Sequence, residues 1–308
     1  MNQPRDASPA RSRLRALLAA KKFALTAEIT PPVSSDLAEL LAKAAPLKGL
    51  ADAVNVTDGA GARPHLDSMV AALALLKEGL EPILQVTCRD RNRIALQSQL
   101  LGAAALGITN LLLLKGDDPR AGDQPDAKPV FDLDTAALAA TAADIRDRGE
   151  LPYGRKVGGS ADFFIGVADS PVDPAPDWRP VGLTKKLEAG AQFAQTQFCM
   201  DAPILRRYVA RLRESGVGDR IPLLIGVAPL ASAKSARWIK QHLFGSIIPE
   251  WMIERLERAS DPQAEGRALC VDLLKEYAEI PGVSGAHVMA PLNERAISSV
   301  LEAFRKSS

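Results

Sequence analysis

Polar side chains stand where several short apolar segments end, and the first of them suits acid–base chemistry. Glu28 lies in the segment ALTAEIT, in which Thr26, Glu28 and Thr30 share one face if the segment is a β-strand. Partial burial favours the protonated form of a carboxyl group, and a protonated carboxyl can act as a general acid. An ion-paired structural glutamate explains the position equally well, so both interpretations stay open here.

A second group of residues follows the segment AVNVT and suits contact with a ligand. Thr57 can donate or accept a hydrogen bond, and Asp58 precedes the small residues Gly59, Ala60 and Gly61. Small residues let a ligand approach the backbone closely. A turn with a helix cap explains the same residues equally well.

Charged and amide side chains mark three further segments. Lys115, Gly116 and Asp117 directly follow a run of four leucines, where a solvated turn is the more common reason. Gln195 and Gln197 alternate in the segment FAQTQF, and an unpaired buried amide costs about 1–3 kcal/mol. A bound polar heterocycle would provide partners for these amides, as would a network of core side chains.

Eight strand-like segments recur along the chain and would position these groups. They begin near Phe23, Ala53, Pro82, Asn110, Phe163, Phe193, Pro222 and Ser284. Helix-like segments fill the intervals, among them DLAELLAKAA, NRIALQSQLLGAAALG and APILRRYVARLRESG. Several begin at Asp, Asn or Ser and end at Gly, as capped helices do. The alternation predicts a parallel sheet, closed into a single (β/α)8 TIM barrel over residues 23–308.

The barrel prediction also says where the chemistry should be, because such barrels carry their sites at the carboxyl ends of the strands. Residues 118–131 and 149–162 are rich in Gly, Pro and Asp and predict loops, and residues 232–280 predict extra helices before the last strand. An open doubly wound sheet is the alternative. It usually carries GxGxxG after its first strand, which this chain lacks, since Pro64 takes the third glycine's place after Gly59-Ala60-Gly61.

The composition argues against several classes of protein. Of 308 residues, 38 are basic and 37 acidic, and the net charge of +1 is unlike that of a general nucleic-acid binder. The sequence has no run of 18 apolar residues that would predict a membrane span. Cys88, Cys199 and Cys270 are far apart, which favours buried thiols in a reducing, cytoplasmic setting over disulfides. The three histidines lack metal-ligand spacing, so no metal site is expected.

Residues 1–22 form an N-terminal extension with many basic and small side chains and one acid, Asp6. The composition faintly resembles an organelle transit peptide, but it has no apolar secretory core. We expect a short disordered start followed by an amphipathic helix near residues 11–22.

Taken together, these segments resemble the methylenetetrahydrofolate reductase family over nearly the whole chain, from about Phe23 to Phe304. The matching segments are AEITPP, VTDGAG, LLKGDDP, KKLEAGAQFAQTQF, IGVAPLASAKSA, IPEWM and HVMAPLNE. Their order and spacing together make the resemblance specific. It implies a (β/α)8 barrel that binds FAD non-covalently. It also implies hydride transfer from NAD(P)H through the flavin to 5,10-methylenetetrahydrofolate, giving 5-methyltetrahydrofolate.

The resemblance implies roles for single residues as well. Glu28 falls on the family's general acid, which helps to open the folate ring, and Asp117 falls on an aspartate near the flavin and the pterin. Gln197 falls on a glutamine that contacts the substrate, and Lys186 on a lysine at the flavin phosphates. The implied cofactor-binding residues are Thr57, Asp58, Ala60, Gln85, Lys115, Gly116, Asp117, Ala168 and Lys186.

Two segments depart from the well-known bacterial members. Residues 167–171 read Val-Ala-Asp-Ser-Pro in place of a Tyr-Pro-Glu-Val-His type segment, and Ala233 replaces a phenylalanine that stacks on the nicotinamide or folate. An alanine offers no stacking surface. Both features resemble a divergent branch known from acetogens, in which a partner protein or another cofactor can supply the electrons. We also expect a homo-oligomer.

Three other functions stay open on the sequence. The same enzyme could run oxidatively on 5-methyltetrahydrofolate in one-carbon catabolism. A pterin-binding methyltransferase barrel would use no flavin and would be colourless. A barrel subunit without activity would keep the fold alone.

Overall fold

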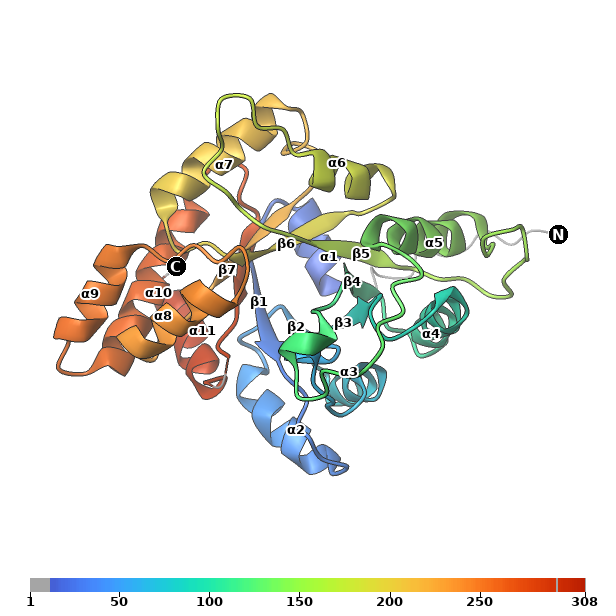
Figure 1. The fold of residues 1–308 in the computed structure, drawn as a ribbon, viewed down its shortest axis with the longest axis horizontal. Helices are drawn as coiled ribbons and strands as arrows, with labels where there is room; N and C mark the ends of the chain where they lie inside the picture. Colours follow the sequence, from blue (N-terminus) through green and yellow to red (C-terminus); the bar gives the residue numbers. More distant parts are fainter. Residues whose placement is uncertain (1–11, 292, 308) are drawn as a thin grey trace.

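The computed structural model describes residues 12–291 and 293–307, and its centre is a closed barrel of eight parallel strands in sequential order (Figure 1). The strands are β1 (Ala24–Ile29), β2 (Ala53–Val56), β3 (Pro82–Thr87), β4 (Asn110–Leu114), β5 (Phe164–Asp169), β6 (Phe193–Phe198), β7 (Leu223–Val227) and β8 (Gly285–Val288). All eight predicted strands are confirmed. β1 pairs with β8 as well as with β2, so the sheet closes and the predicted TIM barrel is confirmed.

Helices surround the barrel (Figure 1). They are α1 (Arg13–Ala19), α2 (Leu37–Ala44), α3 (Ser68–Lys77), α4 (Arg93–Ala105), α5 (Thr135–Arg148), α6 (Val181–Glu188), α7 (Ala202–Glu214), α8 (Ala233–His242), α9 (Glu250–Arg258), α10 (Pro262–Ala278) and α11 (Arg295–Ser307). Short 3-10 turns occur at η1 (Ala45–Leu47), η2 (Ala60–Ala62) and η3 (Pro119–Ala121). The predicted cap chemistry is present, because these side chains accept backbone N–H bonds at helix starts: Asp36, Asp67, Asn92, Asp134, Asp201, Ser232 and Asp261.

The two predicted loops and the extra helices are also found. Residues 115–134 contain only the η3 turn between β4 and α5, and residues 149–163 connect α5 to β5 without a helix or named strand. Helices α8, α9 and α10 all lie between β7 and β8. Within residues 12–291 and 293–307, no helix is long and apolar enough to cross a membrane. Leu292, within the terminal HVMAPLNE segment, lies outside the described residues.

The barrel interior is apolar at the amino ends of the strands. One small buried cluster fills it, with one member from each of seven strands and two leucines from α1: Leu14, Leu18, Ala24, Ala53, Ile83, Leu112, Phe164, Phe193 and Leu224. Phe193 stacks on Phe164 with ring centroids 4.7 Å apart, and its ring fills the space where a side chain on Gly166 would be. A second, larger cluster lies outside the barrel, between the strands and the helices. The polar residues of the barrel interior therefore lie toward the carboxyl ends of the strands.

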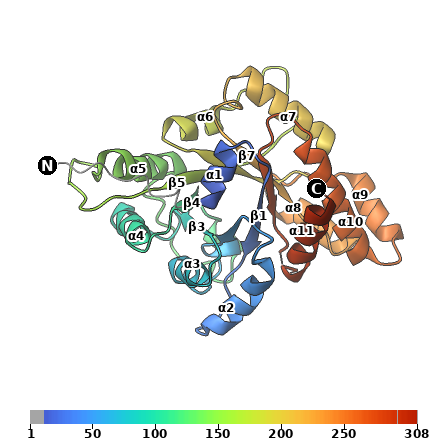
Figure 2. The same ribbon diagram turned by 180° about the vertical axis from the view of Figure 1, so that it is seen from behind.

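Helix α1 covers the amino-terminal end of the barrel. It lies behind the strands in Figure 1 and in front of them in Figure 2. Leu14 and Leu18 point into the apolar floor, while Ser12 donates a hydrogen bond to Asn110 Oδ1 (2.6 Å) and Arg15 pairs with Asp162 (2.5 Å). The helix expected within the N-terminal extension is therefore present, and it packs on the barrel. Residues 1–11 of that extension lie outside the described residues.

Removing the Leu14 side chain should destabilise the whole barrel. Leu14→Ala leaves a cavity under the barrel floor, so we expect the free energy of unfolding to fall by about 2–5 kcal/mol. Leu37→Ala is the matched control, because Leu37 is 39% exposed and should cost about 0.5 kcal/mol or less. Urea denaturation measures both. Equal losses in the two variants would show that α1 does not support the barrel.

Candidate functional site

A buried polar network lies inside the barrel, above the apolar floor. Asn55 Nδ2 donates to Gln195 Oε1 (2.6 Å), and Gln195 Nε2 donates to Thr26 Oγ1 (3.2 Å). The Thr26 hydroxyl is also 2.9 Å from Nδ1 of His287, and all four residues are at most 2% exposed. Of the two explanations for the Gln195 amide, the structure thus supports a network of core side chains.

Glu28 lies at the upper edge of this network, at the carboxyl end of β1. Its Oε2 accepts a hydrogen bond from Gln85 Nε2 (3.2 Å) and is 3.5 Å from His287 Nε2. The side chain is 22% exposed, so the carboxyl group is held by the barrel on one side and open on the other. Strand alternation predicted this direction correctly. The contact with Gln85 also brings together two residues that were predicted separately.

His287 is a functional candidate that the sequence analysis missed. It lies on β8, where the register places it opposite Thr26 of β1, and it contacts both Thr26 and Glu28. The available signal was a single polar residue in the apolar segment GAHVMA. That signal could not identify the partner, because the contact depends on closure of the barrel between its first and last strands.

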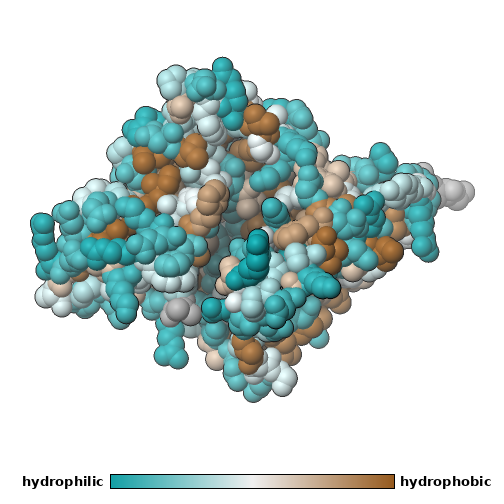
Figure 3. Space-filling view, in the orientation of Figure 1, coloured by the Kyte–Doolittle hydropathy of each residue, from teal (hydrophilic) through white to brown (hydrophobic). Residues whose placement is uncertain are grey.

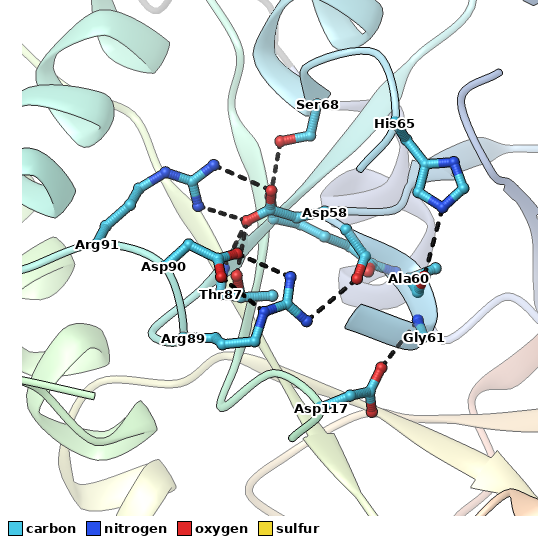
Figure 4. Close-up of polar contacts among 12 residues, drawn as sticks. Asp58, Ala60, Gly61, His65, Ser68, Thr87, Arg89, Asp90, Arg91 and Asp117 are labelled. Carbon is cyan, nitrogen blue, oxygen red and sulfur yellow. Dashed lines mark hydrogen bonds and ion pairs between the residues drawn. The ribbon is translucent and has the colours of Figure 1, made fainter. Parts of the chain in front are cut away.

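The loops after β2 and β3 are joined by an ion pair (Figure 4). The Asp58 carboxylate accepts two hydrogen bonds from Arg91, at 2.7 and 3.0 Å, and two more from the backbone N–H and hydroxyl of Thr87. Burial is the largest single effect on the Arg91 pKa and lowers it, but the hydrogen bonds to Asp58 and the negative charges of Asp58, Asp67 and Asp90 together raise that pKa. Asp58, predicted to contact a flavin, is therefore fully engaged within the protein.

Arg89 and Asp117 lie beside this ion pair (Figure 4). The Arg89 guanidinium donates to the Gly59 carbonyl (3.1 Å) and to Asp90, and the Asp117 carboxylate accepts the Gly61 N–H (3.0 Å). Asp117 is exposed, so it also faces solvent at the mouth. Sequence reasoning missed Arg89 and Arg91, because the run RDRNR is typical of a solvated turn.

Three predicted cofactor residues meet in a separate pocket between the ends of β4 and β5. The pocket has a volume of about 250 Å³ and is lined by Leu113, Leu114, Lys115, Thr135, Ala168, Asp169, Ser170 and Lys186. Lys186 Nζ donates to the carbonyl of Ala168 (2.6 Å), and Lys115 Nζ is 5.5 Å from the centroid of the Phe131 ring. The predicted set Lys115, Ala168 and Lys186 is therefore brought together.

Asp169 contributes a buried carboxyl group to the same pocket. Burial raises its pKa, while a hydrogen bond from the Tyr208 hydroxyl and the nearby Lys186 ammonium act in the opposite direction. Tyr208 is buried, and both burial and the adjacent carboxylate raise its pKa. The pocket thus combines two lysines with one buried carboxyl group whose pKa is raised.

The remaining predicted site residues, Thr57, Ala60 and Gln197, are less closely tied to these groups by hydrogen bonds. Thr57 is buried, and no hydrogen-bond partner reaches its Oγ1 within the described part of the chain. The Ala60 carbonyl is 3.4 Å from His65 Nε2. Gln197 is half-buried, and its Oε1 accepts the Phe198 N–H (3.0 Å), so it does not join the Gln195 network.

The carboxyl-terminal face of the barrel carries all three groups. Seen from this side, the molecular surface is hollowed near its centre, with hydrophilic and hydrophobic side chains around the hollow (Figure 3). The predicted buried thiols are confirmed elsewhere: the three cysteines are free and buried, and burial raises the pKa of Cys88 to about 11 and of Cys199 to about 12. The candidate site is therefore an acid–amide–imidazole group, an ion-paired loop cluster and a lysine-lined pocket, at one end of the barrel.

Comparison with solved structures supports the fold. A Clostridium thermocellum protein, described as binding two copies of 5-methyl-5,6,7,8-tetrahydrofolic acid, superimposes with a TM-score of 0.69 at 14% identity, covering 96% of this chain and 100% of that chain. The monooxygenase EmoA from Chelativorans sp. BNC1 superimposes with a TM-score of 0.57 at 14% identity, covering 93% and 94% of the two chains. At these identities the similarity concerns the barrel alone.

Sequence comparison is more specific. A probable methylenetetrahydrofolate reductase (NADPH) of Caenorhabditis elegans is 25% identical over 77% of this chain, which spans only 34% of that relative's length. The 5,10-methylenetetrahydrofolate reductase of Pectobacterium carotovorum is 26% identical, covering 80% of this chain and 79% of the relative. Residues 13–305 match the family described as methylenetetrahydrofolate reductase. The chain therefore belongs to the methylenetetrahydrofolate reductase family.

Proposed function

We propose that this protein reduces 5,10-methylenetetrahydrofolate to 5-methyltetrahydrofolate, using FAD as the hydride carrier. The observation that carries the proposal is Glu28: a half-buried carboxyl group at the mouth of a family barrel, held by Gln85 and His287 and open on its other side. Reduction of a methylene bridge to a methyl group needs an acid beside the ring nitrogen that leaves the carbon. The departing ring nitrogen must be protonated before the carbon becomes electrophilic enough to accept hydride.

The residues around the mouth fit FAD. Thr57 Oγ1 is buried without a hydrogen-bond partner in the described structure. Buried polar atoms are normally hydrogen-bonded, and a polar atom of the cofactor would provide this partner. The two ammonium groups of Lys115 and Lys186 beside the 250 Å³ pocket would hold the phosphates. When bound, FAD supplies hydride transfer between the electron donor and the folate carbon.

Within this proposal, the chain's own groups bind and orient the substrate and move the proton. Glu28 gives its proton to the folate ring nitrogen. Gln85 and His287 fix the position of the Glu28 carboxyl, and the buried Thr26, through its contact with His287, fixes the imidazole. Asp117 and Gln197 would bind the donor and acceptor edge of the pterin ring, because a carboxylate and an amide match such an edge. The binding of a methylated folate by the Clostridium thermocellum barrel is consistent with a folate as the ligand of this barrel.

A conservative change at Asp117 should disturb the folate and the flavin together. Asp117→Asn keeps an oxygen for the Gly61 N–H but removes a negative charge at the mouth, so we expect folate affinity to fall by about tenfold. The flavin potential should rise, because a nearby negative charge disfavours the reduced, more negative flavin. Calorimetry with 5-methyltetrahydrofolate and a redox titration measure the two effects.

Asp118→Asn is the control, since Asp118 is exposed and pairs with Arg120. Unchanged folate affinity and unchanged flavin potential in Asp117→Asn would show that Asp117 only shapes the turn.

The electron donor is either a reduced nicotinamide or a partner protein, and Ala233 is the residue that bears on the choice. Ala233 begins α8 and is 7% exposed, so it offers neither a ring nor much surface for a nicotinamide. Anaerobic titration of the oxidised flavoprotein with NADH and NADPH separates the two donors. Bleaching of the flavin band identifies a nicotinamide, and an unchanged band identifies a separate donor.

A further inference from the structure

Arg89 is a buried cation outside the groups that take part in the proposed reaction. It follows β3, its side chain is 5% exposed, and it lies between the turn after β2 and the turn after β4 (Figure 4). Its guanidinium forms a forked pair with Asp90, at 2.8 and 2.7 Å, and this hydrogen bonding raises the Arg89 pKa. A charge so deeply placed persists only because its hydrogen bonds are satisfied.

Both neighbouring turns are shaped to admit this side chain. Gly59 has a φ of +62°, and a side chain there would collide with Nη2 of Arg89. Gly116 has a φ of +92°, and a Cβ there would lie 2.8 Å from the Cβ of Arg89. Glycine is therefore needed at both positions for the backbone angle and for the close approach of Arg89. The arginine and the two turns form one packed unit.

A continuous set of contacts leads from Arg89 to Asp117. Nη1 of Arg89 donates to the Gly59 carbonyl (3.1 Å), and two residues later the Gly61 N–H donates to Asp117 (3.0 Å). Gly61 also has a positive φ, +63°, so the turn that Arg89 contacts has a left-handed backbone at both Gly59 and Gly61. The Ala62 N–H also donates to the Gly59 carbonyl (3.0 Å), so Arg89 and Ala62 together hold this carbonyl at the start of the turn.

We propose that Arg89 is a positioning residue, which holds the turn after β2 so that the Gly61 N–H orients the Asp117 carboxylate toward the substrate. The inference rests on the proposed function, because it assigns Arg89 a role in folate binding through Asp117. Arg91 has a different role: it binds the Asp58 side chain, and within the described part of the chain it makes no hydrogen bond to the Gly59–Gly61 backbone. The two arginines of one short loop thus support different parts of the mouth.

A double-mutant cycle separates positioning from general support of the fold. We would measure the dissociation constant of 5-methyltetrahydrofolate by calorimetry in the FAD-reconstituted wild type, Arg89→Gln, Asp117→Asn and the double variant. Residues that act through one another show non-additive effects. We expect Arg89→Gln to weaken binding about tenfold in the wild-type background and less than about twofold in the Asp117→Asn background. A role in the fold alone predicts the same loss in both backgrounds.

The chain offers a matched control and a conservative variant. Arg93 forms a similar forked pair with Asp132, at 2.8 and 2.8 Å, but its side chain, at the start of α4, is 42% exposed. Arg93→Gln should leave folate affinity unchanged. Arg89→Lys keeps the charge but not the fork, so it should weaken binding less than Arg89→Gln does. If Arg89→Gln does not fold, the cycle is run with Arg89→Lys and the same criterion of non-additivity applies.

The outcomes separate the inference from the function on which it rests. A wild type that binds no folate would overturn the proposed function, and the role of Arg89 with it. A wild type that binds folate, with additive losses in the cycle, would overturn the role of Arg89 alone. Non-additive losses, together with an unchanged Arg93→Gln variant, would support it.

Discussion

Glu28→Gln is expected to leave flavin binding and flavin reduction intact while lowering folate turnover by about 10²–10⁴-fold. Glutamine has the same shape and can still contact Gln85 and His287, so the barrel mouth should keep its structure. It has no acidic proton to give to the folate ring nitrogen. Single-turnover measurements separate the two half-reactions: reduction of the flavin by its donor, and reoxidation of the flavin by the folate.

The control for this variant is Glu78→Gln, which changes an exposed glutamate at the end of α3. It should behave as the wild type does in both half-reactions. Wild-type folate turnover in Glu28→Gln would contradict the assignment of Glu28 as the general acid. Loss of flavin binding in that variant would instead show that the residue is structural.

Lys186→Met should give the largest effect on the cofactor. Methionine keeps much of the length of the side chain but removes the ammonium group from the pocket that Lys115 and Asp169 also line. A hydrogen bond to a charged group contributes about 1.5–3 kcal/mol, so the dissociation constant of FAD should rise by about 10–100-fold. Fluorescence titration of the apoprotein with FAD measures the change. At saturating FAD, folate turnover should recover.

The adjacent lysine provides the control for this experiment. Lys185 pairs with Asp134 at 2.7 Å and does not line the pocket, so Lys185→Met should bind FAD as the wild type does. Equal losses of affinity in the two variants would mean that helix α6 matters only through its overall charge. Unchanged affinity in Lys186→Met would place the flavin phosphates elsewhere.

The fold could be predicted from the sequence because its signals are local. Apolar segments such as NLLLL and PLLIG recur at the spacing of strand–helix units, and capping residues such as Asp134 mark the helix starts. Strand alternation was enough to direct Glu28 into the barrel mouth. For Gln195, the sequence could not decide between a ligand and a core network as the partner of its amide.

The partners within the site could not be predicted, because they come from elements far apart in the chain. The contact of Glu28 with His287 exists only because β8 closes the barrel against β1. Arg89 lies in a charge-rich run that is ordinary for a surface turn, yet it is buried because two glycine turns make room for it. Pairing and burial of this kind depend on the three-dimensional closure, which no local pattern contains.

The most direct test of the account is an anaerobic absorbance titration of the purified, FAD-supplemented protein with 5-methyltetrahydrofolate. The account predicts that the protein takes up FAD and that the folate bleaches the flavin band, since the proposed half-reaction can run in reverse. The same bleaching is expected if the enzyme works in the oxidative direction in the cell, because metabolite levels and not the site set the direction of the reaction. A colourless protein that takes up no FAD, or a flavin band that the folate leaves unchanged, would contradict the account.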